Sequence, residues 1–429
     1  MFGFANFLLL ALFAAAVFDL IFALARGGGL RGALHGPWNT PHLLFGQQLA
    51  EWRLQLGRIL FAAGLAAYEI SVVFCNSMAR ENWPFLQGQL APMLDMIMYT
   101  LLCGKILLGT RYTWRELLAG GALYFIARWV YFNSQNIWWI GIVVAVLAAK
   151  DVSLRRPLQV YFASGCAAMT VVLALHFAGI VAPDLTSERM GALRGTYGYG
   201  HPNTFGGLVF GLVLAYALLR AQKVRWVDCL LVFAVGVFLL VGPASRSAAL
   251  CTLALAVGLV FCRLRAGYSV PRWWPGTCAG MVGLTAAVSY LLPLLVIKVG
   301  PWNNDIGPAW LAKLDSLLTC RISLTWMAYR LLDVKIAGQV FNWPTVDNSF
   351  AFALFQFGPV VAALLGILFA AALWGHAKQG RRVEVCCLFA MLAYAYMEVQ
   401  PFHLTTNPTA LLLCGAVFAQ TSARWQKIE

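Results

Sequence analysis

The chain has 429 residues, of which 61% are apolar or aromatic and only 11% are charged. Soluble domains carry about a quarter charged residues, so this composition excludes a soluble enzyme. The net charge of +14 is scattered between apolar runs and forms no single basic surface segment, which argues against nucleic acid as a partner. The composition therefore predicts an integral membrane protein.

Apolar runs of helical length follow one another along the whole chain. About 20 apolar residues are needed for a helix to cross a bilayer. The first run, 4–25, is too long for a signal-peptide core and lacks a basic segment before it, so we interpret it as a retained helix. We expect an all-α, polytopic protein with about 13 (11–15) transmembrane helices, at 4–25, 59–79, 87–109, 116–133, 136–149, 158–182, 204–219, 226–243, 247–262, 275–297, 348–374, 384–400 and 408–423.

The distribution of basic residues predicts the orientation of these helices. If the loop containing Lys150, Arg155 and Arg156 is cytoplasmic, 20 of the 31 Lys and Arg residues lie in cytoplasmic segments and 9 lie outside. This bias follows the positive-inside rule. It predicts that residues 1–429 form one membrane domain with a cytoplasmic C-terminus and two large outer loops, 183–203 and 298–347.

The first outer loop is dense in polar side chains, with the sequence RMGALRGTYGYGHPNTFGG. A proline suited to a first helical turn places His201 and Asn203 at the N-terminus of the next helix, where backbone N–H groups favour anions. Together with Arg189 and Arg194, and with Tyr199 beside them, they predict a phosphate or diphosphate site. The alternative is a simple helix cap beside a glycine-rich turn.

A second polar interruption, GPASRS, separates two apolar helices at the outer surface. Arg246 lies there between Ser245 and Ser247. An arginine at a helix end often only anchors that end at the membrane interface. Between two hydroxyl groups, it is equally suited to bind a phosphate.

The long outer loop contains LDSLLTCRISLTWMAYRLL, whose apolar residues recur at helical spacing from Leu314 to Leu324. The spacing predicts an amphipathic segment that contains Arg321. The loop ends with Asp347 and Asn348, which we expect to cap the helix predicted at 348–374. Anchoring and capping are the structural alternatives to a substrate-binding role for these residues.

Glu398 lies near the outer end of the helix predicted at 384–400. A carboxylate in an apolar run costs several kcal/mol unless it is paired, so Glu398 is a functional candidate, and pairing with an outer-loop arginine is its alternative role. His201, Asp347 and Glu398 are the candidate general bases, and the sequence does not choose among them. The cysteines show no metal-ligand spacing, and Cys320 is the one that we expect to be exposed.

Several of these segments, in this order, resemble the Wzy-type polysaccharide polymerases, the O-antigen and capsule group, especially those of Gram-positive bacteria. The resemblance covers roughly residues 85–415 and rests on AKDVSLRRP, RGTYGYGHPNTFG, GPASRS, DSLLTCRISLTW and VDNSFAFALFQFG, followed by Glu398 and Asn407. The N-terminal run and the glycine-rich stretch after it match no pattern of the family.

The resemblance implies an inverting glycosyltransferase of the GT-C type that needs no metal and no cofactor. It implies undecaprenyl-diphosphate-linked oligosaccharides as substrates outside the membrane, with a flippase and chain-length regulators as partner proteins. A developing diphosphate charge suits fixed arginines and a helix N-terminus. The alternatives are an O-antigen-ligase-like transferase and, in a different class, an exporter of lipid-linked sugars.

Overall fold

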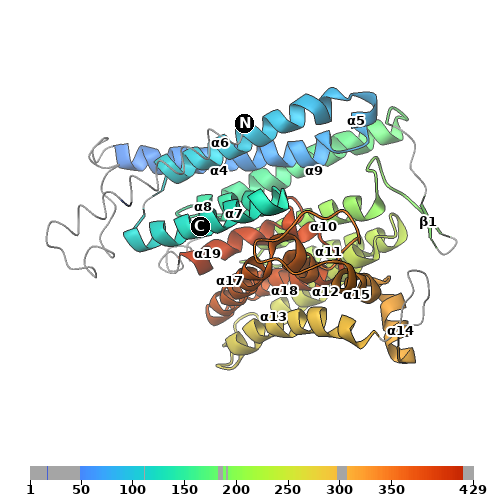
Figure 1. The fold of residues 1–429 in the computed structure, drawn as a ribbon. Coiled ribbons are helices and arrows are strands. Elements are labelled where there is room, and N and C mark those ends of the chain that lie inside the picture. Colours follow the sequence, from blue (N-terminus) through green and yellow to red (C-terminus); the bar gives the residue numbers. More distant parts are fainter. Residues whose placement is uncertain are drawn as a thin grey trace. The chain divides into compact units, whose positions relative to one another are not determined.

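The computed structural model describes residues 17, 49–110, 112–181, 187–189, 192–296 and 307–418. These residues are almost entirely helical (Figure 1), as the sequence predicts. The two described strands, β1 (Ser187–Arg189) and β2 (Ala192–Arg194), pair antiparallel within the predicted loop 183–203. The helix predicted at 4–25 lies outside the described residues.

The chain divides into two compact units. Unit 1 contains the described residues up to Phe125, then Ile140–Leu208 and the residues from Ala410 onward. Unit 2 contains Ile126–Trp139 and Val209–Thr409.

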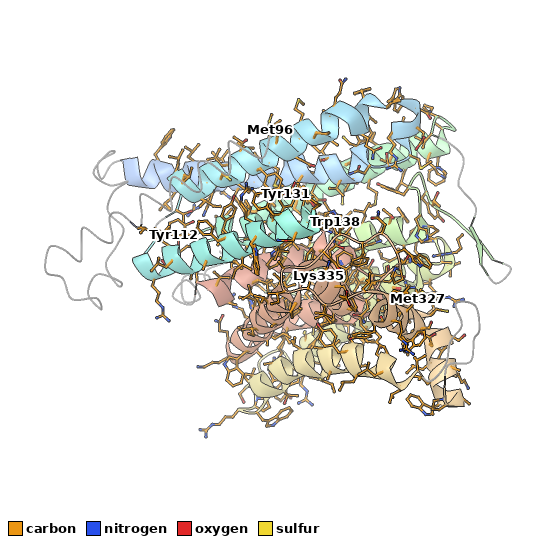
Figure 2. All side chains as sticks on the ribbon, in the orientation of Figure 1. Met96, Tyr112, Tyr131, Trp138, Met327 and Lys335 are labelled. Carbon is orange, nitrogen blue, oxygen red and sulfur yellow. The ribbon has the colours of Figure 1, made fainter. Side chains whose placement is uncertain are left out.

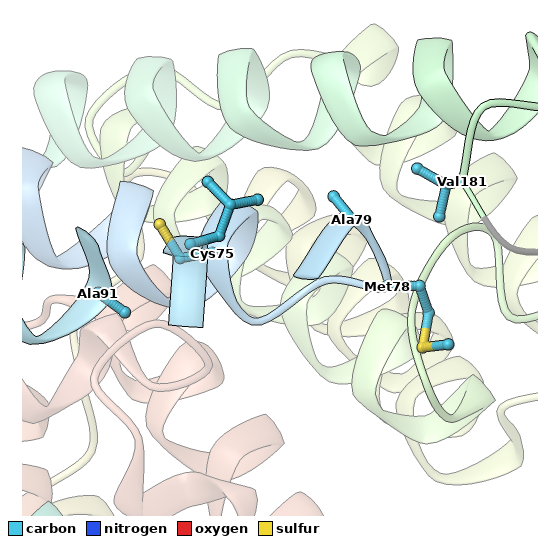
Figure 3. Packing of buried hydrophobic residues seen from close by; sticks show 6 residues of the cluster. Cys75, Met78, Ala79, Ala91 and Val181 are labelled. Atoms are coloured by element: carbon cyan, nitrogen blue, oxygen red, sulfur yellow. The ribbon is translucent and has the colours of Figure 1, made fainter. Parts of the chain in front are cut away.

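Unit 1 is built around the long helices α4 (Leu49–Ile70), α6 (Ala91–Leu108) and α9 (Arg155–Phe177), with α4 packed against both of the others (Figure 1). Figure 3 shows a buried apolar cluster in which Cys75, in this view, lies between Ala91 and Ala79 of the short helix α5 (Ala79–Asn82). The unit also contains α8 (Trp138–Ala148) from Ile140, most of α7 (Trp114–Ser134) and the start of α10 (Pro202–Leu219).

Unit 2 is a second helical bundle. Its closest pairs are α11 with α12, α12 with α18, and α13 with α17. Three short helices, α14, α15 and α16, connect α13 to α17. The helices from α11 to α18 (Figure 1) have the bounds α11 Trp226–Val241, α12 Arg246–Leu264, α13 Trp274–Leu291, α14 Ala309–Leu317, α15 Arg321–Leu331, α16 Ser349–Phe352, α17 Pro359–Lys378 and α18 Arg382–Met397.

Seven helices in the described part of the chain are long and apolar enough to cross a membrane: Leu54–Cys75, Leu86–Leu108, Arg155–Phe177, Pro202–Leu219, Arg246–Leu264, Trp274–Leu295 and Pro359–Lys378. Their surfaces carry large exposed apolar side chains, among them Met96 of α6 (Figure 2), Val257 of α12 and Ile367 of α17. Such surfaces are stable in lipid and costly in water. The structure is therefore compatible with that of a polytopic membrane protein.

Within the described residues, several of the predicted spans are shorter than a membrane-crossing helix. Among the predicted spans, α8 has 11 residues and α18 has 16. At 1.5 Å per residue, α8 is about 16 Å long, which is short of the roughly 30 Å hydrocarbon core. The helix predicted at 408–423 is a 3-10 segment, Pro408–Leu413, followed by the short α19 (Cys414–Val417). The count of thirteen therefore stays a prediction.

The single helix predicted at 348–374 is wrong, because the chain breaks at Gly358. Gly358 has φ 88°, and it separates the segment Ser349–Phe357 from α17. A Cβ at this position would overlap the backbone oxygen of Ile336. Only glycine adopts this conformation readily and allows so close a backbone approach.

We therefore expect Gly358→Ala to lower the unfolding temperature in detergent. The backbone conformation at Gly358, φ 88° and ψ 165°, alone costs a residue with a Cβ about 1–3 kcal/mol, and the overlap adds to this cost. Gly366→Ala in the same α17 is the matched control, since a Cβ there has open space and φ is not positive. Gly358→Ala unfolding no earlier than Gly366→Ala would contradict this account of the break.

The amphipathic segment predicted from Leu314 to Leu324 is also divided. It forms α14 and α15, separated by a turn in which Thr319 and Cys320 have φ of 56° and 64°. Left-handed conformations at these two residues, both of which carry side chains, end α14 and separate it from α15. The apolar spacing alone continued across this turn and did not reveal it.

Candidate functional site

Arg321 is the first residue of α15 and lies between two carboxylates. Its Nη1 is 2.9 Å from Oδ2 of Asp347, and its Nη2 is 3.0 Å from Oε1 of Glu398. Its Nε donates to the backbone oxygen of Met397 at 2.8 Å, and Nη1 also donates to that of Thr319 at 3.1 Å. We call Arg321, Asp347 and Glu398 the acid–arginine cluster. It joins three segments that lie far apart in the sequence, all within unit 2.

The sequence predicts that Glu398 lies inside a helix at 384–400. In the structure it lies just outside, as the residue that follows the end of α18. Its Oε1 accepts hydrogen bonds from Ser247 Oγ at 2.9 Å and from Arg321. The side chain is only 6% exposed. Glu398 thus has the arginine partner that the sequence suggested as its alternative role.

Asp347 is the more accessible of the two carboxylates. Its side chain is 24% exposed, against 8% for Arg321. The sequence attributed capping to Asp347 together with Asn348, and for Asp347 this is wrong. Asn348 alone caps α16, accepting from the backbone N–H of Phe350 and Ala351, while its Nδ2 donates to Ser289 Oγ. Asp347 instead pairs with Arg321, and part of its side chain stays exposed.

Arg246 begins α12 and directly precedes Ser247, the residue that donates to Glu398 of the cluster. It is exposed, while Ser245 just before it is buried and its Oγ has no hydrogen-bond partner among the described residues. Ser247, just after it, contacts Glu398. The N-terminus of α12 therefore presents a cation at the surface and a hydroxyl group to the cluster.

The other predicted site residues lie in unit 1. Arg194 is buried and donates from Nη2 to Asn203 Oδ1 at 2.9 Å. His201 is exposed, and its Nδ1 accepts the backbone N–H of Asn203 at 3.1 Å, as a cap of α10 does. Tyr199 is buried against Phe205. Burial raises the pKa of Tyr199, and the charge of Glu69 raises it further. The backbone of Arg189 pairs with that of Ala192.

The structure thus brings together one subset of the predicted residues in each unit. Arg321, Asp347 and Glu398 contact one another in unit 2, and Arg194 contacts Asn203 in unit 1. The sequence reasoning did not single out Ser349, whose Oγ donates to the backbone oxygen of Glu398, or Asp315. Asp315 could have been found from the sequence, because it is a charged residue among the apolar positions of the predicted amphipathic segment.

Comparison with known proteins identifies no relative: no family model matches the chain, and no curated protein or solved structure matches it either.

Unit 2 also contains an aromatic cluster. One of its members, His403, closely follows Glu398 in the sequence. The ring of His403 lies 4.0 Å from that of Trp138 (labelled in Figure 2), and Trp138 also stacks on Phe352 of α16. Burial lowers the pKa of His403 from 6.5 to about 4. His403 is therefore neutral at pH 7 and behaves as part of an apolar aromatic group.

This shift predicts that the protein loses stability in acid. Between pH 6.5 and about 4, the unfolded chain binds a proton at His403 that the folded chain does not, so stability falls as pH falls through this window. We expect the unfolding temperature in detergent to drop less between pH 7 and pH 5 in His403→Gln than in the wild type. His201→Gln, at an exposed histidine, is the control. An equal drop in His403→Gln and the wild type would contradict the assignment.

Proposed function

We propose that the protein is a membrane glycosyltransferase that joins undecaprenyl-diphosphate-linked oligosaccharide repeat units into a cell-surface polysaccharide. The acid–arginine cluster carries the proposal, because it supplies a carboxylate held in a fixed position at a partly open site. The resemblance to the Wzy-type polymerases supports the substrate and product classes. The segments and residues on which this resemblance rests include Arg321, Asp347 and Glu398 of the cluster.

In the proposed reaction, a hydroxyl group of the acceptor sugar attacks C1 of the donor sugar. The bond from C1 to the diphosphate oxygen breaks with inversion at C1, and its electron pair leaves with the lipid diphosphate. The proton of the attacking hydroxyl passes to a general base. We assign this role to Asp347, because its side chain is 24% exposed while that of Glu398 is 6% exposed.

Arg321 has a different role in this proposal from the phosphate contact that its sequence suggested. Its guanidinium nitrogens already donate to Asp347, Glu398, Met397 and Thr319. We therefore assign it to positioning the carboxylates. The leaving diphosphate is assigned to Arg246 at the N-terminus of α12, where the helix dipole favours anions.

The proposal includes a membrane topology. It places about thirteen spans in a GT-C-like arrangement, the loops 183–203 and 298–347 outside the membrane, and the C-terminus in the cytoplasm. The bias of basic residues supports this orientation. A reaction outside the membrane would also have no access to nucleotide-activated sugars, which suits a lipid-linked donor.

Reconstitution tests the proposal. The purified protein in liposomes, supplied with an undecaprenyl-diphosphate-linked oligosaccharide as the sole substrate, should give a ladder of products that differ by one repeat unit. Growth of a chain only on an added acceptor of another class would identify a ligase. Movement of the lipid-linked sugar across the bilayer without any new glycosidic bond would identify an exporter.

A further inference from the structure

Asp315 is a buried carboxylate that the proposed chemistry does not use. It lies in α14 and is 0% exposed. Its Oδ1 accepts the backbone N–H of Ile322 at 2.7 Å and that of Ser323 at 3.2 Å, and its Oδ2 accepts Ser323 Oγ at 2.8 Å. All three bonds go to the first turn of α15.

The start of α15 depends on these bonds. The residue at its N-cap position, Cys320, is left-handed and makes no side-chain cap hydrogen bond. The first N–H groups of a helix have no partner within the helix. Asp315 supplies one from α14, and its backbone oxygen also accepts the N–H of Cys320 at 2.8 Å. A single residue thus closes the left-handed turn and caps the helix that follows it.

Arg321 lies inside this capped turn. It precedes Ile322, whose N–H is held by Asp315, and its guanidinium must reach Asp347, Glu398 and Met397 at once. A guanidinium makes several bonds together only when its planar group is correctly oriented. The direction of the Arg321 side chain is in turn set by the backbone at the start of α15.

We propose that Asp315 is a positioning residue that fixes the first turn of α15 and thereby holds Arg321 between Asp347 and Glu398. For its effect on catalysis, this inference rests on the proposed function. An ordinary cap would contribute only to stability. A positioning residue also sets the turnover rate, because a displacement of about 1 Å at a catalytic group can cost roughly 10²-fold.

Cys320 gives a readout that does not depend on activity. It is exposed and directly precedes Arg321, while the other described cysteines are buried or partly buried. Maleimide modification of the peptide containing Cys320, followed by mass spectrometry, measures how firmly this turn is held. We expect Asp315→Ala to raise the modification rate of Cys320. Asp333→Asn, at an exposed aspartate in the same loop, should leave it unchanged.

Kinetics then separate positioning from capping. We expect Asp315→Ala, measured well below its unfolding temperature, to lower kcat by about 10²-fold with little change in KM. Asp315→Asn keeps an oxygen that accepts the backbone bonds, so it should recover much of the rate and also serves if the alanine variant does not fold. Ser323→Ala, which removes one of the three bonds to the Asp315 side chain, should remain close to the wild type.

The outcomes are distinguishable. Wild-type kcat in Asp315→Ala, with or without faster modification of Cys320, would overturn the positioning role, as would an unchanged modification rate. A wild-type protein that makes no polymer would refute the proposed function, and faster modification of Cys320 in Asp315→Ala would then still support the control of the Arg321 turn by Asp315.

Discussion

Arg321→Met is expected to destabilise the protein strongly and to abolish polymerisation. Methionine has a similar length but no charge, so the variant leaves Asp347 and the buried Glu398 without their shared cation. Removing one partner of a buried ion pair typically costs about 3–5 kcal/mol. The unfolding temperature in detergent measures this loss. Arg321→Lys should be intermediate, because one ammonium group cannot replace the planar fork that reaches both carboxylates.

Two controls make this prediction specific. Arg330 lies in the same helix, is exposed and stacks on Trp326, so Arg330→Met should have a small effect. Adding Asp347→Asn and Glu398→Gln to Arg321→Met removes the unpaired charges and should restore part of the stability. An Arg321→Met variant that unfolds at the wild-type temperature would show that the cluster is not an ion-paired unit.

Asp347→Asn is expected to lower the polymerisation rate by roughly 10²–10⁴-fold, the usual loss on removal of a general base. The amide retains the shape and one acceptor oxygen for Arg321, so the unfolding temperature should change little. The measurement is the initial rate of polymer formation in liposomes at equal amounts of folded protein.

The other candidate bases provide the comparison. His201 accepts the backbone N–H of Asn203, so His201→Gln should lower the rate far less than Asp347→Asn does. Glu398→Gln removes a charge held by Arg321 and Ser247 and should affect stability more than Asp347→Asn does. A His201→Gln variant that loses the rate while Asp347→Asn keeps it would move the base to the predicted loop 183–203.

Much of the helical architecture could be predicted from the sequence, because helix positions depend on local hydrophobicity. The helix predicted at 226–243 is found at Trp226–Val241, and that predicted at 204–219 begins at Pro202. The breaks at Gly358 and at Thr319–Cys320 could not be predicted in this way. They depend on left-handed backbone conformations and on a close approach to Ile336, which hydrophobic periodicity does not record.

The candidate site shows the same division. Glu398 and Arg321 could be singled out because charged groups in apolar surroundings are costly. Their contact joins residues 77 positions apart, and nothing in the local sequence of either residue selects its partner. Asp315 was missed because its three bonds go to a helix start that the sequence did not reveal.

The most direct test of the proposed function is the stoichiometry of the reconstituted reaction. Purified protein in liposomes should release one undecaprenyl diphosphate for every glycosidic bond that forms between repeat units, and Asp347→Asn should slow both processes equally. Wild-type protein that releases no lipid diphosphate and forms no new bond, although folded and supplied with lipid-linked repeat units, would contradict the account.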